Sequence, residues 1–93
     1  MVTAIILLNV ERNEIRHVAE KLVDIDGVSE VYSVTGRFDL VAIIRVKKDD
    51  DLADLVTEEM TKINGILGTE TMIAFRAYSR HDLDRMFAIG FEK

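Results

Sequence analysis

Two short polar motifs carry the side chains best suited to hold a small molecule. One is the turn TGRFD at residues 35–39, and the other is the threonine pair Thr69 and Thr71. Gly36 permits the positive φ of a tight turn, and Asp39 can accept hydrogen bonds from turn amides. A spacing of two places both threonine hydroxyls on one face of a strand. These residues alone leave a self-capped hairpin and a ligand site equally open, and threonine is common in strands for its β-propensity.

Other kinds of site find little support in the sequence. His17 and His81 are the only histidines, and we expect both at the surface. There is no cysteine and no H-x-x-x-H pair, and Asp49–Asp51 lacks the glycine and distal glutamate of a calcium loop. The segment Gly65–Gly68 lacks the Lys-Ser/Thr of a phosphate loop. We therefore expect no metal ion, no cofactor and no enzymatic activity.

The composition is that of a single small globular domain. The 93 residues are 48% hydrophobic and 31% charged, without proline or repetitive tracts. A net charge of −5 opposes direct binding to nucleic acid or to an anionic membrane, because such binding gains affinity from Lys and Arg. The apolar N-terminal run is too short to span a bilayer and has no basic region before it. A cytoplasmic location is expected.

The chain contains a two-fold internal repeat. At an offset of 38 residues, Ala4–Ile6 aligns with Ala42–Ile44, and Ile25–Val28 aligns with Ile63–Ile66. Each half contains an apolar run, a segment of helical periodicity, an Asp/Asn-Gly stop and an alternating run. The sequence therefore predicts two copies of a strand–helix–strand unit.

The first half predicts a buried strand over Val2–Val10 and a helix with an apolar stripe over Ile15–Ile25. Asn13 is the expected N-cap of this helix, and Gly27 is its expected left-handed stop. A second strand is predicted over Ser29–Thr35.

The second half predicts a strand over Leu40–Val46 and then a helix whose first turn holds Asp49–Asp51, because acidic residues suit a helix N-terminus. Gly65 is the expected stop of this helix. The last strand is predicted over Thr69–Tyr78.

The order βαββαβ predicts a ferredoxin-like α+β plait, with a four-stranded antiparallel sheet and two helices on one face. The other face of the sheet would expose a large apolar patch, so we expect a homo-oligomer formed by sheet-to-sheet packing. We divide the chain into a domain at 1–78 and an extension at 79–93. The extension is predicted to form a short amphipathic helix that packs on its own domain or on a neighbouring subunit.

These motifs together resemble a known family. The order βαββαβ, the G-x-x-D hairpin in VTGRFDLV, the helix stop INGI and the T-x-T strand in GTETMIAF are similar to the effector-binding module of the Lrp/AsnC transcriptional regulators. The resemblance covers about residues 2–78. It implies that an amino acid or a related metabolite binds near the G-x-x-D turn, between dimers that assemble into a ring, commonly an octamer.

Residue by residue, the resemblance implies a ligand site formed by the turn, the strand threonines and two neighbours of the turn: Tyr32, Val34, Gly36, Phe38, Asp39, Thr69 and Thr71. Family members carry a helix-turn-helix, and this sequence begins with the first strand of the module. We therefore expect a stand-alone sensor that regulates transcription through a DNA-binding paralogue.

Three other interpretations remain. A dimeric α/β-barrel enzyme of the small monooxygenase type shares the plait, but the central strands offer only Asn9 as a polar inward residue. An ACT domain also senses amino acids, yet residues 9–15 lack its glycine-containing loop. A purely structural oligomerisation module would need no ligand.

Overall fold

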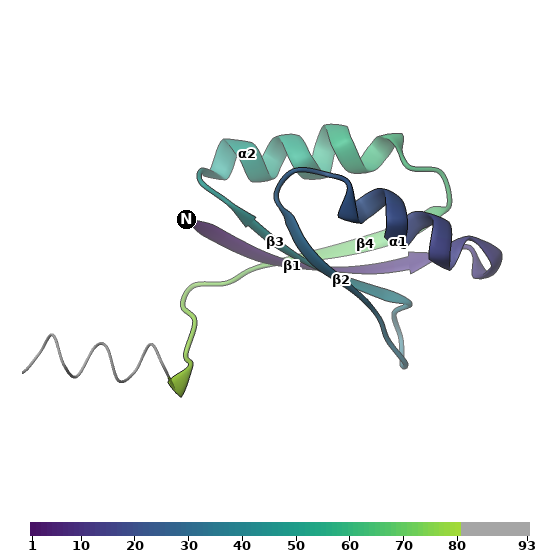
Figure 1. Ribbon diagram of the computed structural model, residues 1–93, viewed down its shortest axis with the longest axis horizontal. Coiled ribbons are helices and arrows are strands. Elements are labelled where there is room, and N and C mark those ends of the chain that lie inside the picture. Colours follow the sequence, from purple (N-terminus) through teal and green to yellow (C-terminus); the bar gives the residue numbers. More distant parts are fainter. Residues whose placement is uncertain (81–93) are drawn as a thin grey trace, which may run out of the picture.

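The computed structural model, described here for residues 1–80, is a four-stranded antiparallel sheet with helices on one face (Figure 1). The elements are β1 (Val2–Val10), α1 (Ile15–Val23), β2 (Val28–Ser33), β3 (Leu40–Val46), α2 (Asp49–Asp54) and β4 (Ile66–Ile73). The strand order is β2-β3-β1-β4, so the two most apolar strands are central. The predicted ferredoxin-like βαββαβ order is confirmed.

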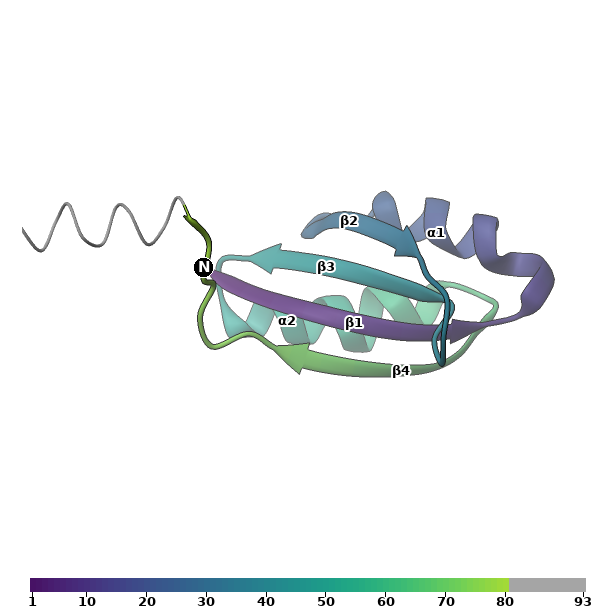
Figure 2. The same ribbon diagram turned by 90° about the horizontal axis from the view of Figure 1, so that it is seen from below.

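The two faces of the sheet have different surroundings. On the helix side, Ala4 pairs with Ile44, and Leu8 pairs with Leu40; all four are fully buried. The alternate residues of β1 and β3 point to the opposite face. Figure 2 views the molecule from that side and shows the strands uncovered, with the helices behind them. We call this uncovered surface the open face.

The hydrophobic core lies between the sheet and the helices. Helix α1 contributes Val18 and Leu22, and the second helical segment contributes Leu52, Leu55 and Met60, all of them buried. Their spacing of three and four residues, and of five across the π-helical turn that begins at Leu55, places them on the single apolar stripe that was predicted for each helix. The core therefore covers one face of the sheet and leaves the open face without a partner.

The start of the first helix differs from the expectation. Asn13 lies inside a 3-10 turn over Arg12–Glu14 and is not an N-cap; the helix begins at Ile15 without a side-chain cap. The N–H of Glu14 donates to the carbonyl of Glu11 at 2.9 Å, which closes this turn. A backbone turn therefore takes the place that the predicted side-chain cap would have occupied.

The second helix changes its pitch along its length. Asp49–Asp51 form its first turn, as predicted, and α2 then continues as a π-helical turn over Leu55–Glu59 and a 3-10 turn over Met60–Lys62. The hydroxyl of Thr57 donates to the carbonyl of Ala53 at 2.7 Å. Such side-chain bonds compete with the backbone ladder. Here the hydroxyl of Thr57 lies within the π-helical turn over Leu55–Glu59.

Glycine stops both helices, as expected. Gly27 has φ +100° and Gly65 has φ +106°, a region that favours glycine. The carbonyl of Gly27 accepts a hydrogen bond from the N–H of Arg45 at 2.8 Å, and the carbonyl of Gly65 accepts one from the N–H of Glu11, also at 2.8 Å. Each stop is thus tied to the chain of the other half.

The edge strands end earlier than predicted. β2 ends at Ser33, and β4 runs over Ile66–Ile73 where Thr69–Tyr78 was expected. β4 needs β1 as its partner, and the last bond between them joins the N–H of Ala74 to the carbonyl of Thr3 at 2.9 Å. Only Val2 of β1 lies beyond this bond, so the pairing ends here. The predicted C-terminal helix falls mainly on residues 81–93, outside the described part of the chain.

Candidate functional site

The hairpin between β2 and β3 places the predicted turn at one end of the sheet. Gly36 has φ +105°, and no atom lies within 4 Å of the position where a Cβ would stand. The N–H of Val34 donates to the carbonyl of Asp39 at 3.0 Å and closes the loop. In Figure 1 the hairpin extends away from the helices. The turn is therefore open to solvent and to any second molecule.

Asp39 is anchored to the end of β1. Its N–H donates to the carbonyl of Leu8 at 2.9 Å, and its carboxylate Oδ2 accepts from the N–H of Val10, also at 2.9 Å. The carboxylate does not cap the turn amides, which was one of the two alternatives that the sequence left open; its partner lies 29 residues away on another strand. Within residues 1–80, the second oxygen, Oδ1, has no hydrogen-bond partner.

The two threonines lie on the helix side of β4. Thr69 pairs with Leu8 and Thr71 pairs with Ile6, so they share the face of those buried residues, yet both are exposed at this edge. Thr69 also lines a shallow groove of about 300 Å³ beside Met60. Because Leu8 contacts both Asp39 and Thr69, these two residues flank the same end of β1, about 10 Å apart by strand spacing.

The remaining predicted residues divide between two places. Phe38 is half-buried beside Asp39, and Val34 is 39% exposed at the base of the hairpin. Tyr32 pairs with Val41 and therefore lies on the open face, away from the threonines. The structure thus brings the turn residues to the end of β1 that Thr69 also flanks, and leaves Tyr32 outside this group.

Tyr32 belongs to a polar cluster that the sequence did not reveal. Its hydroxyl donates a hydrogen bond to a carboxylate oxygen of Glu30, and the other oxygen of Glu30 lies 3.8 Å from the guanidinium of Arg45. The exposure of these groups makes the ion pair a small contributor to stability. The only sequence signal was the two-residue spacing of Glu30 and Tyr32, which puts both side chains on one face of β2.

The pKa of Tyr32 should therefore fall when Glu30 is replaced by glutamine. The hydrogen bond to Glu30 and the negative charge of its carboxylate raise the pKa of Tyr32 above 10.0. The neutral phenol is the stabilised form, so this contribution is present below pH 10 and is lost as the pH rises through the folded-state pKa. Ultraviolet titration of Glu30→Gln in a Tyr78→Phe background, which leaves one tyrosine, measures the change. An unaltered midpoint would contradict the assigned cause.

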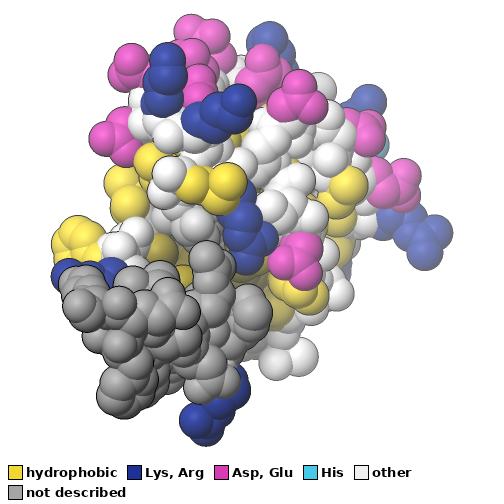
Figure 3. All heavy atoms as spheres, turned by 60° about the vertical axis from the view of Figure 1, so that its left-hand side comes forward, with side chains coloured by type: hydrophobic (Ala, Val, Ile, Leu, Met, Phe, Trp, Pro, Cys, Tyr) yellow, Lys and Arg dark blue, Asp and Glu magenta, His cyan; other side chains and the backbone are white. Residues whose placement is uncertain are grey.

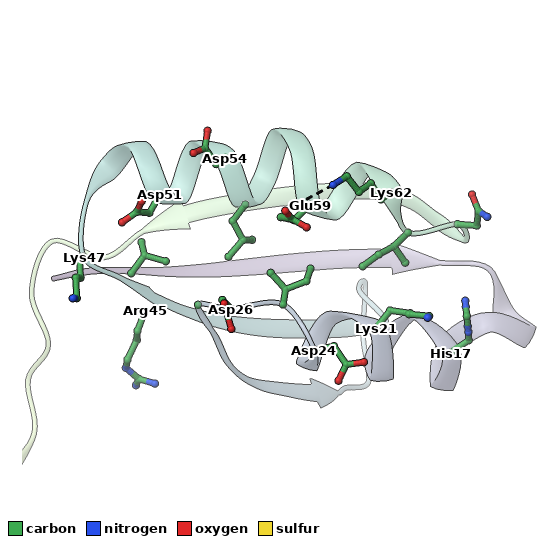
Figure 4. A pocket seen from close by; sticks show the side chains of 16 residues that line it. His17, Lys21, Asp24, Asp26, Arg45, Lys47, Asp51, Asp54, Glu59 and Lys62 are labelled. Carbon is green, nitrogen blue, oxygen red and sulfur yellow. Dashed lines mark ion pairs between the residues drawn. The ribbon is translucent and has the colours of Figure 1, made fainter.

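A hollow with a volume of about 980 Å³ lies between the two helices. Figure 4 shows its charged rim, with Asp24, Asp51 and Asp54 interspersed with Lys21 and other basic residues. Figure 3 shows acidic and basic side chains gathered over the upper part of the molecule. In the described residues no group of three or more His, Cys, Asp or Glu is placed to hold a metal ion.

None of the helices in the part that the structure describes is long and apolar enough to cross a membrane.

Comparison with known proteins gives a consistent result. The family model of the Lrp/AsnC ligand binding domain matches residues 3–83. The HTH-type transcriptional regulator FL11 of Pyrococcus furiosus is 35% identical over 77 residues, which are 83% of this chain and 50% of that protein. The chain spans about half the length of the curated relatives it matches. These relatives are described as transcriptional regulators and not as enzymes.

Solved structures share the fold. The protein TTHA0845 of Thermus thermophilus has a TM-score of 0.80 and 42% identity, with 86% of this chain and all of that chain covered. A transcriptional regulator of Neisseria meningitidis, solved in complex with L-Met, has a TM-score of 0.75, with 85% of this chain and 53% of that chain covered. Its identity of 12% shows a common fold alone.

Proposed function

This chain belongs to the Lrp/AsnC ligand-binding domain family, and on that premise we propose that it is a non-enzymatic sensor of an amino acid or a related metabolite. The proposed site is the end of β1 that the G-x-x-D turn and Thr69 flank, with Thr71 two residues after Thr69 on β4. The observation that carries the proposal is the anchored carboxylate of Asp39, which keeps one oxygen free of protein partners within residues 1–80.

The chemistry of this end of the sheet suits a zwitterion. An amino acid needs an acceptor for its ammonium group and donors for its carboxylate. The free Oδ1 of Asp39 supplies the acceptor. Within the described chain the N–H groups of residues 35–38 make no backbone hydrogen bond, so they supply the donors. Because Val10 already holds the other oxygen, the carboxylate is oriented before a ligand arrives, which lowers the entropic cost of binding.

The expected affinity is modest. Charge-assisted hydrogen bonds contribute roughly 1.5–3 kcal/mol each. Two or three such bonds, less the cost of association, correspond to dissociation constants from about micromolar to millimolar. A sensor in this range responds to changes in a cellular metabolite pool.

We propose that two copies pack through their open faces. Ile5, Leu7, Val41 and Ile43 lie side by side on this face and stay only half-buried in one chain. A second sheet at the usual face-to-face spacing of about 10 Å would cover them. Such dimers would assemble into an octameric ring, with the effector between dimers near the turn.

In this proposal a partner protein links the sensor to transcription. A DNA-binding paralogue with a helix-turn-helix would supply the nucleic-acid contact, since the net charge of −5 disfavours it here. Residues 1–78 would be the sensing domain and 79–93 a subunit contact, in a protein of the cytoplasm. Curated relatives that are transcriptional regulators support this assignment.

Removing the charge of Asp39 should weaken effector binding about 10- to 100-fold. Asp39→Asn keeps an oxygen that accepts from the N–H of Val10 but loses the charge-assisted bond to an ammonium. Isothermal calorimetry of the wild-type chain against the twenty amino acids identifies the ligand, and the variant is then compared on that ligand. Asp24→Asn, an exposed carboxylate far from the turn, is the matched control and should bind like wild type.

Two results would contradict the proposal. The first is a wild-type chain that binds none of the amino acids and keeps the same native mass with any metabolite mixture, which is the behaviour of a structural module. The second is Asp39→Asn binding as tightly as the control.

A further inference from the structure

Residues 74–80 leave the sheet without covering any of it. After the bond between Ala74 and Thr3, the chain makes no further ladder contact with β1. Figure 1 shows this segment turning toward the side of the sheet opposite the helices. The segment therefore extends on the side of the open face, where the proposed dimer would place its second subunit.

The segment carries large apolar side chains that its own chain leaves in solvent. Phe75 is 101% exposed and Tyr78 is 72% exposed, and Ile73, at the end of β4, is 58% exposed. Single exposed hydrophobic residues are ordinary, but a series of them on one projecting segment marks an interaction surface. These side chains would be buried by an apolar surface of another molecule, because the chain's own core does not contact them.

The segment is long enough to reach a second sheet. Extended chain spans about 3.3 Å per residue, so residues 74–80 reach up to about 23 Å. Sheets packed face to face lie about 10 Å apart. The segment can therefore cross the gap and still lay about four residues along the far sheet.

Charge is compatible with this placement. Arg76 and Arg80 have no ion-pair partner among the residues that the structure describes. Glu70 pairs with Leu7 across the ladder, which places this carboxylate on the open face, again without a partner in the described chain. A second copy could bring Arg76 and Arg80 of one chain close to Glu70 of the other.

We propose that residues 74–80 form an arm that packs along the edge of the open face of a second copy of this chain, beside the part that the two sheets cover, with Phe75 and Tyr78 as its apolar contacts. The proposal rests on the sheet-to-sheet dimer proposed above. It adds a second contact between the two chains, which the arm provides. Each chain gives one arm and receives one, as the two-fold symmetry of an isologous dimer requires.

Paramagnetic relaxation in mixed dimers tests the arm directly. The chain has no cysteine, so Ala77→Cys gives a single attachment point for a nitroxide label. The spin-labelled chain without isotope is refolded together with ¹⁵N-labelled wild type. We expect strong broadening of the ¹⁵N amides of Ile5, Leu7 and Ile43, and no broadening with a diamagnetic label.

The converse sample separates the two ways of packing. When the nitroxide and ¹⁵N are on the same chain, diluted into excess unlabelled protein, we expect Ile5 to broaden, because Ala74 bonds to Thr3 beside it, but Leu7 and Ile43 to broaden less than in the mixed dimer. Broadening in this sample alone would show an arm folded on its own chain and overturn the proposal, while the dimer would stand. A chain that is monomeric at every concentration would overturn both the dimer and the arm.

A second measurement uses the arm's apolar contacts. Phe75→Ala with Tyr78→Ala should raise the dimer dissociation constant about tenfold or more, as the loss of aromatic contacts at an interface does. Val23→Ala removes an apolar side chain that is also exposed, to 54%, but lies on the helix side, and it should leave the constant unchanged. Equal dissociation constants for the arm variant and wild type would overturn the proposal.

Discussion

Gly27→Ala should destabilise the fold by about 2–5 kcal/mol. An alanine at φ +100° pays about 1–2 kcal/mol for the left-handed conformation. Its Cβ would also stand 2.7 Å from Cγ1 of Val46 and 3.1 Å from Cδ1 of Leu55, which adds the cost of overpacking, about 1–3 kcal/mol. Chemical denaturation at a fixed protein concentration measures the loss, because self-association would make stability depend on concentration.

Gly36→Ala is the matched control for this prediction. Gly36 has nearly the same φ, +105°, but nothing lies within 4 Å of its added Cβ. The control therefore carries the backbone cost alone, about 1–2 kcal/mol. Gly65→Ala should fall between the two, since its Cβ would meet Cβ of Glu14 at 3.1 Å and Cγ2 of Val18 at 3.2 Å. Equal losses for Gly27→Ala and Gly36→Ala would disprove the steric part of the explanation.

Ile43→Lys should convert the proposed dimer to a folded monomer and weaken self-association at least about 100-fold. Ile43 lies in the middle of the open face, opposite Ile5. Two-fold packing would bury a lysine ammonium from each chain without full hydration, at a cost of several kcal/mol. In the separated chain the lysine is solvated, and Glu30 faces it from β2. Native mass spectrometry and analytical ultracentrifugation give the mass, and circular dichroism confirms the fold.

The control for this variant is Val23→Lys. Val23 is 54% exposed at the end of α1, where a positive charge agrees with the helix dipole. It changes the net charge by the same amount and should leave the assembly intact. An Ile43→Lys chain that keeps the wild-type mass would show that the open face is not the interface.

The central part of the fold was predictable from the sequence to the residue. Strands Val2–Val10 and Leu40–Val46 were predicted with the bounds that the structure shows, because a strand covered on its helix side and apolar on its open face forms a nearly continuous apolar run. The stops at Gly27 and Gly65 followed from the repeat. These features depend on short stretches of chain, which a local pattern can reveal.

The edges of the sheet and the partners of the site were not predictable in the same way. The end of β4 depends on where β1 begins, and the carboxylate of Asp39 bonds to Val10, 29 residues away. The position of Tyr32 on the open face depends on the register shift between Val28 and Glu30. Each of these is set by pairing between distant segments. The motif located the turn, but only the strand register shows which residues share its end of the sheet.

The crossed contacts of the two glycine stops bear on how the chain folds. Gly27, in the first half, bonds to Arg45 in the second, and Gly65, in the second half, bonds to Glu11 in the first. Each helix stop is therefore held in part by a backbone bond from the other strand–helix–strand unit. Although the sequence is a duplication, we expect the two halves to behave as one foldon. They should gain and lose protection from hydrogen exchange together, as one cooperative unit.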